Sequence, residues 1–499
     1  MTLREHNKEN GPEERRAESL RHSKLSIFGL LAVGVICATL LVGFYYGIEV
    51  EKPMLEVQDV PNFVGSREVQ VGFRARDTGS GIDSIVVSVE QAGASQQIAR
   101  FDPSGIVHEF SGTFPLSKAI VGLREGPAIV RVDVRDRSLW ASTTNVVFPI
   151  VVDSFDPSLQ LLSAPRAIDF GGVGLFVYKA GDANLIGNGI AIGTEEYAEG
   201  RPAALMDSDL LQPDLFAVLV AAPEKESGEW AVFASDVAGH NVRVPVSVEV
   251  RSTRSDQKVV SEYASEGALI RLLANLSQEL ANGAPEMERR NIERFRQDLE
   301  TSGRKGAIEF VNYLIPTIRE SELNTIQKRL AVEVPTPRRW RGEMFTGPFA
   351  LRVGFGDRIV IGDEQGEFVS WTSQGEVLEP IGDATSVVAP YAGTVRMAGR
   401  LGTLGEIVVV DHGAGLSSVF YSLEQRLVFE GAVVTQGQAL ADIGTSGLHT
   451  SKAARMLFLV NGRPVAPALW RQTSGFSSTV DGALNGIKGA LGIESSSAE

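Results

Sequence analysis

The amino-acid sequence predicts a mainly β, multidomain chain with one membrane-spanning helix near its N-terminus. Apolar and polar residues alternate in many short runs, which is the period of half-buried strands. One pattern of strand, aspartate, turn and strand occurs at Asp136 and recurs at Asp236. The last third places glycines between short apolar runs. At 499 residues the chain is long enough for about three to four domains.

The transmembrane helix is predicted at residues 25–48, which contain no charged side chain. Such a helix reaches roughly 36 Å, enough to cross a hydrocarbon core of about 30 Å. Basic residues precede it and acidic residues follow it, so residues 1–24 are expected in the cytoplasm and the rest outside. A cleaved signal peptide is the alternative, but no small-x-small cleavage site follows Tyr46. The chain has a single cysteine, Cys37, which lies within this span. Because a disulfide needs two cysteines, none can form within the chain.

Two tandem β-sandwiches of the immunoglobulin-like kind are predicted at residues 53–152 and 153–250. Alternating runs at residues 69–76, 85–89, 130–134 and 145–152 indicate strands of the first. The recurrence at Asp236 and Asn241 indicates the second. The aspartates that close these strands could bind calcium, but an Asx-turn explains them better because no dense set of oxygen ligands surrounds them.

A helical linker or subdomain is predicted at residues 255–334. Leucines and isoleucines between residues 269 and 280 recur at helical spacing, and residues 282–285 break this helix. A charged helix at 286–300 and two short helices at 308–318 and 321–332, separated near Pro316, are expected to follow. After the C-terminal domain at 340–472, the tail 473–499 is expected to be flexible or to form an amphipathic helix at 480–493.

Several Gly-punctuated motifs mark the C-terminal domain, and their glycines indicate tight turns between short buried strands. The motifs are Val387–Pro390, Gly393–Val395, Gly405–Leu416, Val419–Leu423, Val433–Gln438, Ile443–Gly447 and Leu459–Val465. In this order and spacing they resemble the LytM/lysostaphin family of peptidoglycan metallopeptidases. The resemblance covers about a quarter of the chain and implies a compact antiparallel β domain with a groove across it.

The resemblance also implies a zinc site, and the implied positions hold other residues. The family binds zinc through a His-x-Gly-x-Asp element and the second His of a His-x-His element, and further His residues assist the bound water. Here Ser373, Val377 and Arg455 stand at the metal-ligand positions, and Ser422 and Ala453 stand at the catalytic His positions. An imidazole or carboxylate can bind Zn²⁺, whereas these side chains cannot replace them. No zinc or other cofactor is therefore expected.

Two histidines remain beyond residue 250. His412 lies in an Asp-His-Gly turn that is scaffold in the family, and His449 follows the Ile443–Gly447 motif. A replacement metal site could be drawn from His449 and four carboxylates, although their spacing does not demand one. The four are Asp383, Asp411, Glu376 and Glu379. We expect Arg455, His449 and Tyr421 to line the groove, where Arg455 could bind a carboxylate of a wall peptide or of a partner protein.

These observations predict a non-catalytic LytM-like envelope protein. It is expected at the cell inner membrane as a single-pass protein with its bulk in the periplasm, and to bind peptidoglycan or to position or activate a cell-wall hydrolase. The alternatives are a zinc endopeptidase with unconventional ligands and a structural component of envelope assembly. The net charge of -15 argues against a general nucleic-acid binder, which would present a basic face.

Overall fold

The computed structural model describes residues 29, 31–42, 51–65, 67–223, 228–251, 257–263, 266–283, 286–331, 335–363, 366–449, 451–471 and 475–493. The chain divides into two compact units, one formed by residues 1–155 with 237–240 and the other by residues 156–236 with 241–499. The predicted membrane span at 25–48 lies partly outside the described residues, and its described residues, 29 and 31–42, are helical. Of the helices in the described ranges, none is long and apolar enough to cross a membrane.

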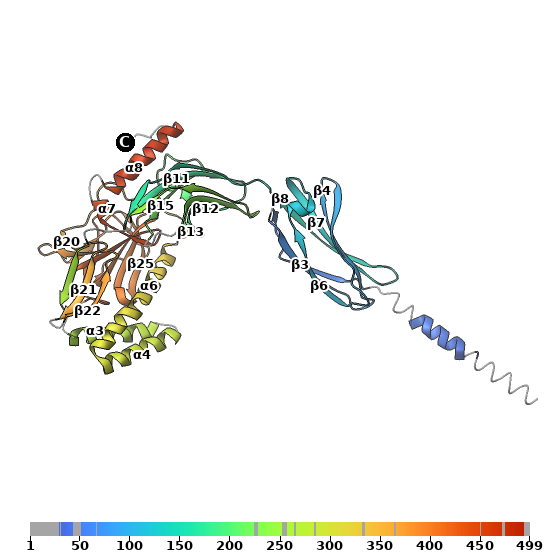
Figure 1. Cartoon of the computed structure of the whole chain (residues 1–499), viewed down its shortest axis with the longest axis horizontal. Helices are drawn as coiled ribbons and strands as arrows, with labels where there is room; N and C mark the ends of the chain where they lie inside the picture. The colour runs from blue at the N-terminus through green and yellow to red at the C-terminus, as the bar shows by residue number, and fades with distance from the viewer. Residues whose placement is uncertain are drawn as a thin grey trace, which may run out of the picture. The chain divides into compact units, whose positions relative to one another are not determined.

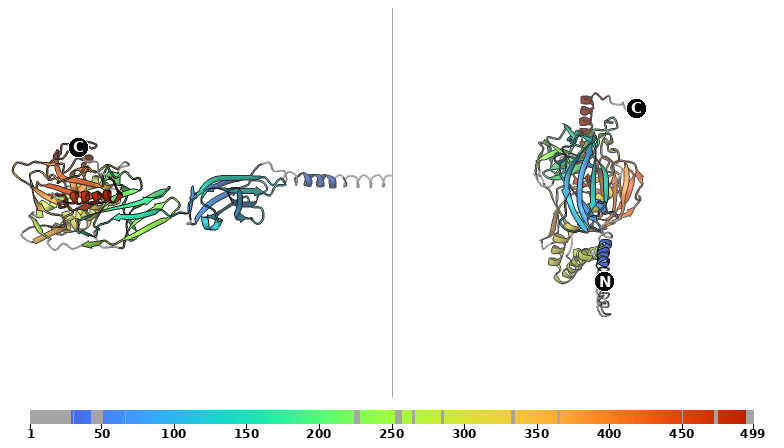
Figure 2. Two further views of the ribbon diagram at one scale, coloured as in Figure 1. Left: turned by 90° about the horizontal axis from the view of Figure 1, so that it is seen from above. Right: turned by 90° about the vertical axis from the view of Figure 1, so that its right-hand side faces the viewer.

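The first unit contains two sheets that enclose one apolar core (Figures 1 and 2). Their strand orders are β1-β3-β6 and β2-β8-β7-β4-β5. Alternate residues of β3, β4, β7 and β8 point into this core, so the predicted strands of the first β domain are confirmed. The elements are β1 Met54–Gln58, β2 Phe63–Val64, β3 Val69–Arg76, β4 Ile82–Gln91, β5 Ala94–Phe101, β6 Glu109–Leu116, α2 Lys118–Val121, β7 Gly126–Asp136 and β8 Thr143–Val152.

The turn after β7 is the predicted Asx-turn. One carboxylate oxygen of Asp136 accepts hydrogen bonds from the backbone N–H of Ser138 at 3.1 Å and from its hydroxyl at 2.7 Å. Asp136 therefore ties down the connection between β7 and β8 in the way that its position predicts.

The second unit begins with a second pair of sheets. The sheet β14-β15-β11-β9 packs against the sheet β13-β12-β16-β17, and the rings of Phe176 and Trp230 stack at 5.8 Å between them. The elements are β9 Ser158–Ser163, β10 Ala167–Asp169, β11 Val173–Gly181, β12 Leu185–Ile192, β13 Glu195–Glu199, β14 Arg201–Pro202, η1 Ala203–Leu205, β15 Leu215–Ala221, β16 Trp230–Asp236, β17 Asn241–Val246 and β18 Glu249–Arg251.

One sheet of this second sandwich is buried on both faces. Phe176 and Val218 point into the sandwich core, whereas Val177 and Leu219 pack into the core of the C-terminal domain. The second sandwich and the C-terminal domain therefore pack against each other through apolar side chains within the second unit.

The linker is mostly helical, with two corrections to the predicted pattern. Residues 259–263 form a strand, β19, which pairs in parallel with β21 of the C-terminal domain, so the stretch 255–334 is not wholly helical. Helical structure is unbroken through Pro316, which directly follows the π-helical turn η2, where the backbone hydrogen-bond pattern changes and a proline can be accommodated. The elements are β19 Val259–Tyr263, α3 Glu266–Gly283, α4 Glu286–Ser302, α5 Arg304–Glu309, a π-helical turn η2 Phe310–Leu314 and α6 Ile315–Leu330.

The C-terminal domain is built on a ten-stranded sheet whose main path runs β20-β23-β30-β27-β26-β25-β28. Its elements are β20 Phe349–Val353, β21 Arg358–Asp363, β22 Gly366–Thr372, β23 Glu376–Pro380, β24 Ser386–Val388, β25 Gly393–Leu401, η3 Gly402–Leu404, β26 Gly405–Asp411, β27 Leu416–Arg426, β28 Val433–Val434, β29 Ala439–Ile443, β30 Ala454–Val460, β31 Arg463–Val465, α7 Ala468–Arg471 and α8 Phe476–Leu491. This antiparallel β architecture confirms the β domain expected from the motifs.

Different elements cover the two faces of this sheet. Met456 and Phe458 of β30 point into the large core shared with the second sandwich. Leu457 and Leu459 point to the opposite face, where Ile326 of α6 packs on them. The amphipathic helix predicted in the tail is α8, which buries Val480, Leu484 and Ile487 in the shared core. The ends of the tail, 473–474 and 494–499, lie outside the described residues.

Candidate functional site

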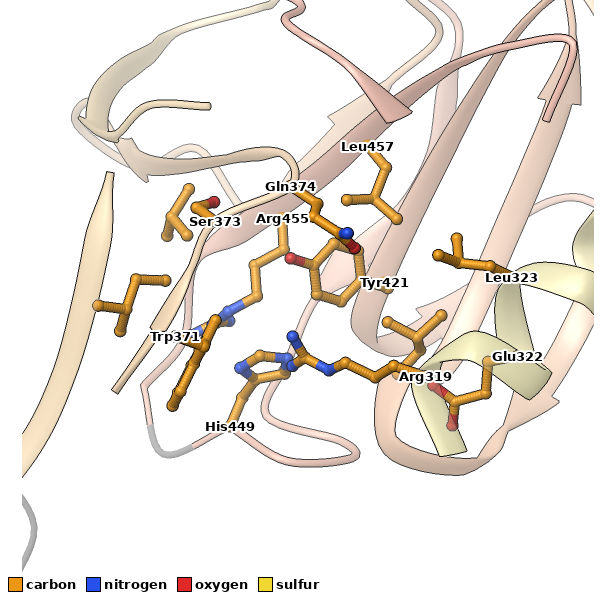
Figure 3. A pocket seen from close by; sticks show the side chains of 13 residues that line it. Arg319, Glu322, Leu323, Trp371, Ser373, Gln374, Tyr421, His449, Arg455 and Leu457 are labelled. Atoms are coloured by element: carbon orange, nitrogen blue, oxygen red, sulfur yellow. The ribbon is translucent and has the colours of Figure 1, made fainter. Parts of the chain in front are cut away.

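The three predicted ligand positions meet at one cavity in the C-terminal domain. Val377 lies directly opposite Arg455 in the antiparallel ladder of β23 and β30, and Ser373 lies in the buried turn that precedes β23. All three residues line a cavity of about 40 Å³ (Figure 3). The fold therefore brings the three predicted ligand positions, Ser373, Val377 and Arg455, together in space.

Arg455 is the central charge of this cavity and is only 1% exposed. Its guanidinium donates to the backbone oxygen and hydroxyl of Ser451 at 3.0 and 3.1 Å, and more weakly to Ser422 Oγ at 3.5 Å. Ser422 has a left-handed backbone, with φ of 62°, and is fully buried. The guanidinium thus joins the loop before β30 to the neighbouring strand β27.

Helix α6 covers the cavity from the side opposite the sheet. Arg319, Glu322 and Leu323 of α6 line it (Figure 3). Glu322 is 4% exposed, and its carboxylate accepts hydrogen bonds from the backbone N–H and the hydroxyl of Thr403. Burial raises the pKa of Glu322 to about 7, although the bonds from Thr403 act in the other direction. This carboxyl group therefore fastens the helix over the cavity.

A ring of aromatic and cationic side chains closes the cavity at His449. The Arg319 guanidinium lies 5.5 Å from the ring centre of Trp371, and the His449 ring lies 5.5 Å from that of Tyr421. His449 keeps some exposed surface, but its Nε2 is buried and has no hydrogen-bond partner among the described residues. Burial, followed by the charges of Arg455 and Arg319, holds the pKa of His449 well below its usual value, so the imidazole is neutral at pH 7.

The predicted groove residues are thus placed in the cavity, while His412 has a different role. Arg455, His449 and Tyr421 all line the cavity. His412 is fully buried, with Nδ1 3.0 Å from the carbonyl of Ala392 and Nε2 2.9 Å from the hydroxyl of Ser418. Burial lowers the pKa of His412 to about 4. It packs as a neutral turn residue, as its motif predicts.

The residues at this cavity do not fit zinc. A hydroxyl, an isopropyl group and a guanidinium occupy the three predicted ligand positions, and a fixed guanidinium repels a divalent cation. Among the described residues that line the cavity, Glu322 and His449 alone are of ligand type, and Glu322 is engaged by Thr403. A catalytic zinc site requires three protein ligands and an open position.

The carboxylates considered for a replacement site do not gather at the cavity either. Asp411 accepts hydrogen bonds from Arg396 and from the hydroxyl of Thr336. Glu376 is buried in an ion pair with Arg471. Asp383 and Glu379 are not among the residues that line the cavity. His449 is thus the single member of the proposed replacement set that the cavity contains.

The contribution of the linker to this site was not predicted from the sequence. Arg319, Glu322 and Leu323 lie in a stretch that the sequence indicates only as a short amphipathic helix. One signal was present, since Glu322 shares a face with Leu323 and Ile326 and therefore interrupts an apolar stripe with a carboxylate. Trp371 was also missed because its strand, β22, carries no family motif.

Comparison with known proteins identifies the domain around this cavity. Residues 376–467 match the model of Peptidase family M23. An uncharacterized metalloprotease of Haemophilus influenzae is 34% identical over 88 residues, which are 17% of this chain and 18% of that protein. The murein hydrolase activator EnvC of Escherichia coli is 28% identical over 222 residues, or 44% of this chain and 48% of that protein. The chain thus spans less than half the length of each of these curated relatives.

A solved structure gives a distant likeness over a larger part of the chain. The crystal structure of a putative peptidase M23 from Pseudomonas aeruginosa aligns with 15% identity and a TM-score of 0.33, covering 61% of this chain and 94% of that one. The family match covers strands β23 to β31, which carry the motifs that resembled LytM and lysostaphin. Residues 376–467 therefore form a domain similar to peptidase family M23, and the predicted LytM-like resemblance is confirmed.

Proposed function

We propose that this chain is a non-catalytic envelope protein whose M23 domain binds peptidoglycan or a cell-wall hydrolase that it positions or activates. The observation that carries this proposal is the position of Arg455. Arg455 stands at a predicted metal-ligand position and lies opposite Val377, and its guanidinium is held by Ser451. Without three ligands for zinc, the domain has no means of generating a metal-bound hydroxide.

The name of one relative supports a role at the cell wall. The Escherichia coli relative is named a murein hydrolase activator, and the Haemophilus influenzae relative a metalloprotease. The composition of the cavity favours the first kind of role over the second. Activation of a hydrolase requires a binding surface, whereas proteolysis requires a reactive centre.

Helix α6 would control access to this surface. Ile326 is fully buried against the sheet, and Glu322 holds the helix to Thr403. A wall peptide or a partner protein can reach Arg455 from this face only after α6 moves away. The helical linker therefore acts in this proposal as a cover over the binding face.

The rest of the chain would deliver the domain to the wall. The apolar segment 25–48 supports a single-pass anchor in the inner membrane, with residues 1–24 in the cytoplasm and the bulk of the chain in the periplasm. We propose that the two β-sandwiches are immunoglobulin-like spacers between the membrane and the M23 domain.

Metal analysis and a sacculus assay with the purified full chain test the absence of catalysis. We expect no stoichiometric zinc and no release of peptides from sacculi. Stoichiometric zinc together with soluble wall peptides would overturn the proposal in favour of an endopeptidase.

Two assays test binding and its control by α6. The first measures how much of the chain binds to purified sacculi, and the second measures the dye that a cell-wall amidase releases from labelled sacculi in the presence of the chain. Ile326→Ala should loosen α6, because removing a buried side chain of this size costs about 2–5 kcal/mol. It should increase sacculus binding or amidase stimulation. Glu320→Ala, at an exposed position of the same helix, is the matched control. If the parent and both variants neither bind sacculi nor stimulate the amidase, a purely structural role is favoured.

A further inference from the structure

Three loops of the first unit meet at one end of its sheets. They connect β3 to β4 (residues 77–81), β5 to β6 (residues 102–108) and β7 to β8 (residues 137–142). We call them together the loop platform. The backbone N–H of Ile82 donates to Val107 O at 2.8 Å, that of Arg137 to Gly81 O at 2.8 Å, and the Arg137 guanidinium to Pro103 O at 2.7 Å. These bonds hold the three loops as one ordered surface.

The loop platform presents large apolar side chains to solvent. Ile106, Leu139 and Trp140 are 73%, 74% and 67% exposed. Trp140 follows the Asx-turn that fixes this loop. Because the three side chains stand on loops that are hydrogen-bonded to one another, they offer an apolar surface at this end of the unit. A tryptophan with an apolar ring and one N–H suits the boundary between lipid headgroups and acyl chains.

The chain enters the first unit at this same end. Strand β1 begins at Met54, which pairs with Arg76 at the end of β3, directly before the first loop of the platform. The hydroxyl of Thr78 in that loop donates to Glu51 Oε2 at 3.1 Å. Ile48, the last residue of the predicted span, is three residues before Glu51. Since a residue spans at most about 3.6 Å, the end of the span lies within roughly 11 Å of Glu51.

We propose that the loop platform inserts into the surface of the lipid bilayer through Ile106, Leu139 and Trp140. The inference rests on the proposed membrane anchor, because the anchor brings the bilayer to this end of the unit. Two attachments, the helix and the loop platform, would then fix the first β domain against the membrane, whereas the helix alone would leave it free to tilt.

Tryptophan emission from the full chain in phosphatidylcholine vesicles tests the inference. Bromine atoms on the acyl chains quench a tryptophan that reaches the membrane interior. We expect lower emission in brominated than in unbrominated vesicles, and Trp140→Phe should remove the difference although the other four of the five tryptophans remain. Equal emission of the parent chain in the two kinds of vesicle would overturn the inference.

A relocated tryptophan provides the matched control. Phe155 is 67% exposed and follows β8, which starts at the loop platform and ends ten residues later, at Val152. At about 3.3 Å per residue, Phe155 lies roughly 30 Å from the platform. In Trp140→Phe/Phe155→Trp the emission should not respond to bromine. A response equal to that of the parent would overturn the inference, because the depth of the tryptophan in the bilayer would then not depend on its position in the loop platform.

Resistance of the vesicle-bound chain to carbonate extraction reports separately on the anchor. A chain that resists carbonate but shows no quenching refutes the loop platform and leaves the anchor standing. A chain that carbonate removes, but that shows Trp140-dependent quenching before removal, refutes the anchor and supports the platform. A lipid-independent blue shift of Trp140 emission that grows with protein concentration would assign the platform to a second copy of the chain and overturn the inference.

Discussion

Replacement of Glu322 by Gln tests how α6 is held over the cavity. The Glu322 carboxyl group is buried and is bonded to the backbone N–H and hydroxyl of Thr403. Gln keeps the shape and can both accept from the N–H and donate to the hydroxyl oxygen. The substitution therefore removes the ionisable group with little change in packing.

The size of the effect follows from the raised pKa of Glu322. Its pKa is about 7 in the folded chain against a reference value of 4.5. Since a carboxyl group with a raised folded-state pKa binds its proton more tightly when folded, its contribution to stability is present at low pH and is lost as the pH rises from about 4.5 to about 7. The shift corresponds to about 3 kcal/mol between these limits, or roughly a hundredfold in the opening equilibrium of α6.

Hydrogen exchange of the α6 amides at pH 5 and pH 8 measures this opening. Because intrinsic exchange rates depend on pH, the parent and Glu322→Gln are compared at the same pH. We expect similar protection at pH 5 and stronger protection of the Gln variant at pH 8, by about two orders of magnitude. Equal protection of the two proteins at pH 8 would refute the reasoning, since ionisation of Glu322 would then not weaken the contact.

Three further predictions concern buried charges and the former ligand positions. Arg455→Met should lower the free energy of unfolding by about 2–4 kcal/mol in urea, because hydrogen bonds from a buried charge are lost; parental stability would show that these bonds contribute nothing. Arg471→Met should cost about 3–5 kcal/mol by leaving Glu376 buried without its partner, and addition of Glu376→Gln should recover much of the loss in thermal melting, whereas no recovery would locate the effect elsewhere. The triple variant Ser373→His/Val377→Asp/Arg455→His should retain about one zinc per chain after dialysis, as counted by metal analysis; a metal-free triple variant would contradict the assigned equivalence of the three positions.

Much of the β architecture could be predicted because its signal is local. The alternation at residues 69–76 depends only on neighbours along one strand, and the structure has β3 at those residues. Strand β19 was missed because its five residues pair in parallel with β21, far away in the sequence, and form no hairpin. The predicted break at Pro316 was wrong because the π-helical turn η2 directly before it changes the hydrogen-bond pattern, so that the helix continues through the proline.

The candidate site was predicted in part for a similar reason. Ser373, Val377 and Arg455 could be found by counting from glycine motifs, since the turns fix the register of the strands that carry them. The side chains that α6 contributes could not be found in this way. Their position depends on the docking of a separate helix, which no motif in the strands encodes.

The sheet of β11 and β15, which is buried on both faces, also limits how this protein can be divided. Leu175, Val177 and Leu219 lie on the face that packs against the C-terminal domain. An expression fragment that starts at residue 340 would expose the surface that these side chains cover, and large exposed apolar surfaces promote aggregation. The smallest fragment that retains this packing begins near Asp156, so soluble preparations of the M23 domain should include the second sandwich.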